Sequence, residues 1–203
     1  MYFDLEALGH QESYRLLVNS IVPRPIALVT TVDAAGTTNA APFSFFNLMG
    51  SDPPILVLGI ERRASGSLKD TVANIRVTGE FAVNLVSEAI AEPMNICATD
   101  YPSGVDELHE AGLTPAAGQL IDVPHIAESP ASFECTVREI LDIGDNRSLI
   151  IGNILAMHLA DEYYDAERRY VLTEKMGLIG RMHGRGWYVR TGDTFHMERR
   201  SLK

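Results

Sequence analysis

The run from Arg62 to Thr71 has residue types and spacing that suit the binding of a phosphate group. Ser67 is followed three residues later by Asp70, which is the spacing of a capping box, so we expect a helix over Leu68–Val77 with Ser67 as its N-cap. A helix start presents unpaired N–H groups and the positive end of the helix dipole. The side chains that could assist are Arg62, Arg63, Ser65, Lys69 and Thr71. A solvated cap with charges for solubility is equally compatible with this pattern.

The segment from Arg24 to Asp52 is a second candidate site. Its only formal charge between those ends is Asp33, and it predicts two strands, Ile26–Val32 and Thr38–Leu48, joined by an Asp-Ala-Ala-Gly turn. The second strand mixes small, hydroxyl and amide side chains with three aromatic residues. Such a strand suits a surface where a flat ligand approaches the backbone closely. An ordinary sheet strand that contains alanines would show the same pattern.

The C-terminal residues 181–203 form a basic segment. They contain five arginines and one lysine against Asp193 and Glu198, on a chain of formal net charge −10. Its first part gathers Arg181, His183, Arg185, Trp187, Tyr188 and Arg190. An anionic small ligand or a salt-bridged surface between subunits would explain this concentration. Because arginine stays charged, we expect these residues to act electrostatically rather than in proton transfer.

Most catalytic signatures are absent from the chain. The six histidines show no H-x-x-x-H or H-x-H pairing, so we expect no metal site. Neither G-x-x-x-x-G-K-[ST] nor G-x-S-x-G occurs, which argues against P-loop nucleotide hydrolysis and nucleophile-elbow hydrolases. The glycines of residues 180–186 lack the spacing of a dinucleotide fingerprint.

Length and composition indicate one domain over residues 1–203, large enough to bury a core without disulfides. The acidic balance argues against nucleic acid or an anionic membrane as a partner. Cys97 and Cys135 lack Cys-x-x-Cys spacing and suit a reducing compartment. The acidic N-terminus does not look like an export signal, and no segment has the length of a membrane span. The sequence therefore predicts a cytoplasmic protein.

The order of predicted elements favours an antiparallel β-barrel. Strands outnumber helices and follow one another through short turns, such as Gly144–Arg147. Besides the first two, the predicted strands are Ile55–Ile60, Glu80–Val86, Phe133–Ile143, Ser148–Leu159, Val171–Thr173, Trp187–Arg190 and Phe195–Glu198. Helical segments are expected at Leu5–Val18, Glu88–Ala98 and Tyr101–Gly112, and Leu113–Pro130 reads as a connecting loop. The predicted fold class is mainly β with a few added helices.

An ordered series of motifs resembles the flavin reductase-like family of FMN-binding split barrels. The motifs are R-P-I-A-L-V-T-T, N-A-A-P-F-S-F-F-N, D-P-P-I-L-V-L-G-I, K-D-T-V-A-N-I and E-F-A-V-N-L-V, followed by D-E-L-H-E-A-G-L-T, P-H-I-A-E-S-P-A-S-F-E-C, L-I-I-G-N-I and G-L-I-G-R. They extend from about Ile21 to Val189. One departure is Arg147, at a position where similar proteins often have a histidine.

The resemblance implies a six-stranded Greek-key barrel that forms a homodimer, with one FMN per subunit in a groove at the dimer interface. It implies that the flavin is lined by Thr30, Thr31, Asn39, Ala41, Ser44, Phe45, Phe46 and Asn47. It implies that the phosphate is held by Arg63, Ser67, Lys69 and Thr71, and that Arg181 lies beside the cofactor or the incoming NAD(P)H, with His183 as a further contact.

The resemblance also implies that FMN accepts a hydride from NAD(P)H, so that the protein needs no catalytic side chain of its own. Two other functions stay open. One is an electron carrier, or an oxidase or monooxygenase, that holds FMN tightly and serves an unknown acceptor or partner protein. The other is a split-barrel binding module without catalysis. An obligate homodimer is expected because the uncharged Phe43–Leu48 stretch would leave aromatic residues exposed on a monomer.

Overall fold

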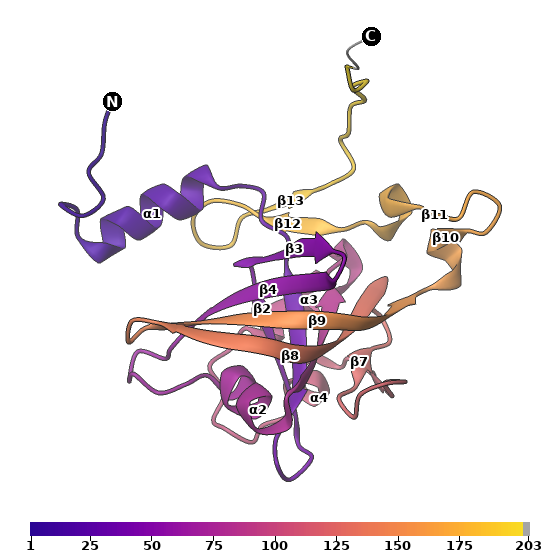
Figure 1. Ribbon diagram of the computed structural model, residues 1–203, viewed down its shortest axis with the longest axis horizontal. Coiled ribbons are helices and arrows are strands. Elements are labelled where there is room, and N and C mark those ends of the chain that lie inside the picture. The colour runs from indigo at the N-terminus through magenta and orange to yellow at the C-terminus, as the bar shows by residue number, and fades with distance from the viewer. Residues whose placement is uncertain (201–203) are drawn as a thin grey trace.

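The computed structural model describes residues 1–200, and a curved antiparallel sheet of seven strands lies at its centre (Figure 1). The strand order is β2-β1-β5-β8-β9-β4-β3. The strands are β1 (Ala27–Val32), β2 (Thr38–Phe43), β3 (Phe46–Ser51), β4 (Pro54–Glu61), β5 (Glu80–Leu85), β8 (Ala131–Ile143) and β9 (Arg147–Leu159). The expected mainly β, antiparallel split barrel with a few helices is confirmed.

The predicted strand Thr38–Leu48 is wrong as a single element, because the chain breaks it at Ser44–Phe45 into β2 and β3. These two strands lie at opposite edges of the sheet although they follow one another in sequence. The break therefore carries the chain across the split of the barrel, and the Gly59 N–H holds it by donating to the Phe45 carbonyl at 2.7 Å. The expected six strands become seven for this reason.

Strand β1 is buried on both faces, and it begins with three apolar residues in a row, Ala27–Val29. Ala27 and Val29 belong to the main core inside the barrel, together with Leu56, Phe81 and Ile150. The alternate residue Leu28 belongs to a second core on the outside of the sheet. The first strand is thus structural at its centre and does not face solvent.

Within residues 1–200, four helices accompany the barrel: α1 (His10–Ser20), α2 (Asp70–Thr78), α3 (Ala91–Cys97) and α4 (Glu107–Ala111). Helix α2 contributes Val72 and Ile75 to the main core. Helices α3 and α4 contribute Met94 and Leu108 to the second core. Helix α1 lies on the opposite side of the barrel from α2, beside the C-terminal hairpin (Figure 1). Short 3₁₀ turns occur at η1 (Glu88–Ile90), η2 (Asp161–Tyr163) and η3 (Thr173–Met176).

Three small two-stranded sheets complete the part of the fold that the structure describes. They pair β6 (Pro115–Ala116) with β7 (His125–Ile126), β10 (Tyr164–Asp165) with β11 (Tyr170–Val171), and β12 (Ile179–Arg181) with β13 (Tyr188–Arg190). Leu113–Pro130, expected as a plain loop, therefore contains two strands. The predicted strand Phe195–Glu198 is not formed. None of the helices among residues 1–200 combines the length and apolar character that a membrane crossing requires.

A fully buried carboxylate holds the 113–130 segment against the barrel. Glu134 of β8 accepts backbone N–H bonds from Gln119 and Leu120, both at 2.7 Å, and from Ile121 at 3.1 Å. It also bonds the His158 ring, on which the ring of His125 stacks with centroids 3.9 Å apart. Burial alone would raise the pKa of Glu134, but these donors outweigh it and lower the pKa.

Candidate functional site

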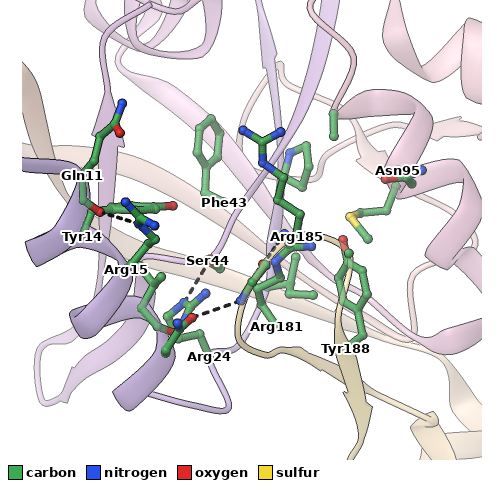
Figure 2. Close-up of a pocket in the computed structure, with 18 of the residues that line it drawn as sticks. Gln11, Tyr14, Arg15, Arg24, Phe43, Ser44, Asn95, Arg181, Arg185 and Tyr188 are labelled. Atoms are coloured by element: carbon green, nitrogen blue, oxygen red, sulfur yellow. Dashed lines mark hydrogen bonds between the residues drawn. The ribbon is translucent and has the colours of Figure 1, made fainter.

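A cleft of about 940 Å³ lies between α1 and the hairpin β12–β13 (Figure 2). Four arginines line it: Arg15 from α1, Arg24 just before β1, Arg181 at the end of β12, and Arg185 from the hairpin loop. No aspartate or glutamate is among its lining residues. The formal charges that line the cleft are therefore all positive. The cleft attracts anions although the chain as a whole has a net charge of −10.

Arg24 holds three segments together at the floor of this arginine-lined cleft. Its Nη1 donates to the carbonyls of Val18 at 2.6 Å and Ile21 at 2.9 Å, both near the end of α1. Its Nη2 donates to the Met182 carbonyl at 3.4 Å, and its Nε donates to the Ser44 hydroxyl at 3.3 Å. Arg24 is only 8% exposed, so it positions the helix, the hairpin and the break after β2.

The C-terminal hairpin attaches to the start of β1 through a backbone bridge between Arg24 and Arg181. The Arg24 N–H donates to the Arg181 carbonyl at 3.0 Å, and the Arg181 N–H donates to the Arg24 carbonyl at 2.8 Å. Burial lowers the pKa of Arg24, the Tyr14 phenol acts in the opposite direction, and the Arg181 charge lowers the pKa further. Two guanidinium groups therefore repel one another at the floor of the cleft.

Aromatic side chains form part of the cleft wall. The Arg181 guanidinium lies 4.8 Å from the centroid of the Tyr188 ring, a cation–π contact. Tyr14 of α1 and Phe43 of β2 also line the cleft. The arrangement combines flat apolar surfaces with cations, which suits a planar ligand that carries negative charge.

A smaller hollow of about 90 Å³ adjoins the cleft. The two share Pro42, Phe43 and Ala98, so they follow one another along β2. Arg63, Lys69 and Thr71 line the smaller hollow at the start of α2. Because β2 is an edge strand, part of its backbone is free to bond a ligand.

Acidic groups also face the small hollow. Asp70 pairs with Arg63 at 2.8 Å. Glu107 is buried and accepts the Ala40 N–H of β2 at 2.9 Å. Burial raises the pKa of Glu107, while the Ala40 N–H acts in the opposite direction. Lys69 is left as the cation of this hollow that has no carboxylate partner within residues 1–200.

The structure corrects the predicted helix cap. Helix α2 begins at Asp70, its N-cap position is Lys69, and no side chain caps it. Ser67 is exposed, and its hydroxyl lies 2.8 Å from that of Ser65 in the preceding loop. The N–H groups at the start of α2 are therefore left without a side-chain acceptor, which keeps the helix start available to an anion.

Of the residues expected at a flavin site, seven line one of the two hollows. Asn39, Ala41, Arg63, Lys69 and Thr71 line the small hollow, and Ser44 and Arg181 line the arginine-lined cleft. Phe45 lies at the break after β2, with the guanidinium of Arg147 4.7 Å from its ring centroid. Arg147, the departure from the family pattern, forms an ion pair with Glu61.

Other expected residues lie elsewhere. Thr30 and Thr31 are fully buried, because both faces of β1 are covered, and their hydroxyls bond the Pro124 carbonyl and the Asn74 amide. Phe46 packs against the main core, and the Asn47 side chain is exposed and bonds the neighbouring Leu48 N–H. His183 is exposed and stacks on Trp187 rather than lining the cleft. The Lys203 end of the basic segment lies outside the described residues.

Sequence reasoning missed Arg15 and Arg24 as site residues. Arg15 lies on α1, whose packing against the hairpin is not encoded by any local pattern. Arg24 stands directly before the first strand, in R-P-I-A, where a charge next to a buried run is a usable but weak signal. It also missed Glu107, which is buried and accepts the Ala40 N–H of β2.

Comparison with known proteins identifies relatives of the whole chain. Residues 19–174 match a family model described as "Flavin reductase like domain". A Deinococcus radiodurans protein is 45% identical over 98% of this chain and 89% of its own length. The crystal structure of 2-nitrobenzoate 2-nitroreductase from Pseudomonas fluorescens is 35% identical, with TM-score 0.91 over 100% of this chain and 98% of that chain. Nitrilotriacetate monooxygenase component B from Bacillus cereus is 30% identical, with TM-score 0.90 and coverage of 97% and 98%.

Proposed function

The chain belongs to the flavin reductase-like family, and from this premise we propose that it is an FMN-dependent oxidoreductase that takes a hydride from NAD(P)H. The observation that carries the proposal is the continuity of the two hollows along β2. A hollow that presents the unpaired Lys69 charge and the uncapped start of α2 suits a phosphate, and the wide cleft next to it suits a flat ring.

The residues present fit FMN at both ends. Lys69, Arg63 and the uncapped N–H groups of α2 would hold the phosphate. Small side chains at Asn39 and Ala41 would let the ring approach the free edge of β2. Thr30 and Thr31 are not part of this proposal because their side chains are buried and bonded.

The bound flavin would supply the hydride-accepting centre. The role of the chain is then binding and electrostatics. Arg181 would favour negative charge on the reduced ring or on the nicotinamide phosphates, without moving a proton. The aromatic walls at Tyr188 and Phe43 would limit water around the ring and provide surfaces for stacking.

A second candidate is an oxidoreductase that holds FMN tightly and passes electrons to a small organic substrate. The full-length likeness to a protein named as a 2-nitrobenzoate nitroreductase favours it. Under either candidate we propose a homodimer in a reducing cytoplasm. The exposed Leu48 and Met49 of β3 support the dimer, and the buried free thiols Cys97 and Cys135 support the compartment.

The test is a flavin titration followed by steady-state oxidation of NADH and NADPH with and without added FMN. A rate that saturates with added FMN indicates that flavin is turned over as a substrate. A rate that is independent of added FMN, in yellow protein, indicates a held cofactor. Protein that is colourless and binds no added FMN would overturn the proposal. The nicotinamide role of Arg181 is checked by stopped-flow flavin reduction in Arg181→Ala, where we expect weaker NAD(P)H binding and a flatter salt dependence.

A further inference from the structure

The arginine-lined cleft carries positive charge that the described residues do not neutralise. Arginines elsewhere in residues 1–200 often pair with a carboxylate, as Arg63, Arg76, Arg147, Arg168 and Arg190 do. Arg15, Arg181 and Arg185 have no carboxylate partner within residues 1–200. Like charges gathered without counter-charge are unfavourable, and an anion in the cleft would relieve that cost.

The same groups offer hydrogen-bond donors that lack acceptors within residues 1–200. Arg15 uses its Nε on the Gln11 carbonyl, and Arg181 uses one Nη2 proton on the Gly184 carbonyl at 3.4 Å. Arg185 has no hydrogen-bond partner there. The Ser44 hydroxyl accepts from Arg24 but finds no acceptor for its own proton. The cleft therefore keeps cationic donors that have no partner within residues 1–200, and a site for an anionic oxygen group needs such donors.

The size and walls of the cleft indicate a ring beside that anion. At about 940 Å³ the volume is near the upper end of the range of about 300–1,000 Å³ for small-molecule sites. A flavin ring at Ser44 would leave room for a second flat molecule. Tyr14 of α1 and Tyr188 of β13 offer that molecule aromatic surface from two different elements.

We propose that the arginine-lined cleft binds a small aromatic carboxylate as a second ligand beside the flavin. The placement of the flavin rests on the proposed function, but the anion site stands on the cleft alone. A carboxylate presents two coplanar oxygens, which match the fork of a guanidinium such as Arg181 or Arg185. Its ring would pack against the aromatic walls.

The geometry of the floor favours a carboxylate over a phosphate. Three of the Arg24 nitrogens are already donating to the chain, and this arginine keeps few free protons. The deep end of the cleft thus offers mainly the Arg181 fork and the Ser44 proton. Two oxygens can be satisfied by these donors, whereas the three free oxygens of a phosphate group would leave at least one poorly bonded.

The test is calorimetric titration of the purified protein with benzoate, benzamide and inorganic phosphate, while visible absorbance follows the flavin. Benzamide has the shape of benzoate without its charge. The variants are Arg15→Gln and Arg185→Gln, and the matched control is Arg168→Gln, which removes an exposed arginine that lines neither hollow. Each cleft variant loses one charge-assisted contact, so we expect benzoate to bind about tenfold more weakly, with the flavin spectrum unchanged.

Saturable benzoate binding that is weakened in both cleft variants and kept in Arg168→Gln supports the proposal. Benzamide that binds as well as benzoate would overturn it, as would phosphate that binds as tightly. Absence of benzoate binding up to about 10 mM would also overturn it. The two proposals can fail independently. Visible absorbance shows whether flavin is bound, and protein without flavin can still be titrated with benzoate.

Discussion

Lys69 is the residue on which phosphate binding should depend most, because its charge faces the small hollow without a carboxylate partner within residues 1–200. We expect Lys69→Ala to remove a charge-assisted contact of about 1.5–3 kcal/mol, which corresponds to a tenfold to hundredfold loss of FMN affinity. Fluorescence titration with FMN measures this loss. Lys175→Ala is the control, since Lys175 is exposed on η3 and lines neither hollow. Equal affinity in the two variants would remove Lys69 from the site.

At the scale of single residues, the sequence grouped the residues of the small hollow better than those of the arginine-lined cleft. Arg63, Lys69 and Thr71 are close in sequence, so a local helix-start pattern brings them together. Arg15 and Arg24 reach the cleft through tertiary contacts with the hairpin, and no local spacing encodes those. Thr30 was expected to line the flavin, but its side chain is buried and bonded to the Pro124 carbonyl, a tertiary contact that no local pattern encodes.

The element that holds segment 113–130 to the barrel is the Glu134 carboxylate. We expect Glu134→Gln to lower the free energy of unfolding at pH 7 by about 1–3 kcal/mol, since an amide NH₂ would face backbone donors. Chemical denaturation measures this, with Glu139→Gln, an exposed residue of the same strand, as the control. An unchanged unfolding midpoint in Glu134→Gln would contradict the role.

The pH dependence of this clamp has a definite sign. The pKa of Glu134 is lowered in the folded protein, so its stabilisation is present above the ordinary glutamate pKa and is lost as pH falls through the lowered value. Burial, with the neighbouring His158, also lowers the pKa of His125, so the folded state disfavours its protonation. Both groups therefore make the folded protein less stable at acidic pH. The difference in free energy of unfolding between wild type and Glu134→Gln should therefore shrink below about pH 4.

The position of hairpin β12–β13 depends on Gly180. A Cβ there would lie 2.9 Å from the Cβ of Pro23 and 3.4 Å from the Arg24 carbonyl oxygen. Neither group can move easily. Gly180→Ala should therefore lower the free energy of unfolding by about 1–3 kcal/mol and shift Arg181 away from Arg24. We expect a lower Tm together with weaker benzoate binding. Gly192→Ala is the control, since nothing lies within 4 Å of its Cβ position. Wild-type Tm and binding in Gly180→Ala would refute this account.

For the whole molecule we expect a homodimer, although the reason differs from the one that the sequence offered. Phe43 is buried and Phe46 packs on the main core, so the aromatic residues are largely covered within one chain. The apolar side chains left exposed on the edge strand β3 are Leu48 at 58% and Met49 at 59%. Light scattering should return about twice the 22.3 kDa of one chain, and Leu48→Asp should shift the mass toward one chain. A wild-type mass near 22.3 kDa at micromolar concentration would exclude the dimer.

The barrel itself could be predicted because its signals are distributed along the chain. Alternating or continuous apolar runs mark β4, β5, β8 and β9, and the order of motifs indicates how they connect. The break at Ser44–Phe45 could not be predicted from the sequence. It is imposed by the closure of the sheet, and neither of its two residues is a glycine or a proline. The same holds for β6 and β7, because the segment that joins them is held by the Glu134 carboxylate and not by strand propensity.

The bridge between Arg24 and Arg181 ties the C-terminal hairpin to the start of the barrel, and it makes that hairpin a natural reporter for proteolysis. Trypsin cleaves after arginine, and the exposed loop of residues 182–187 presents Arg185 next to the cleft. A protease must draw this loop into an extended strand, which requires local opening of the hairpin. Any ligand that bonds Arg181 or Arg185 opposes that opening in proportion to its binding energy. Slower tryptic cleavage after Arg185 would then show that a ligand occupies the cleft, even if that ligand has no colour and releases no heat on binding.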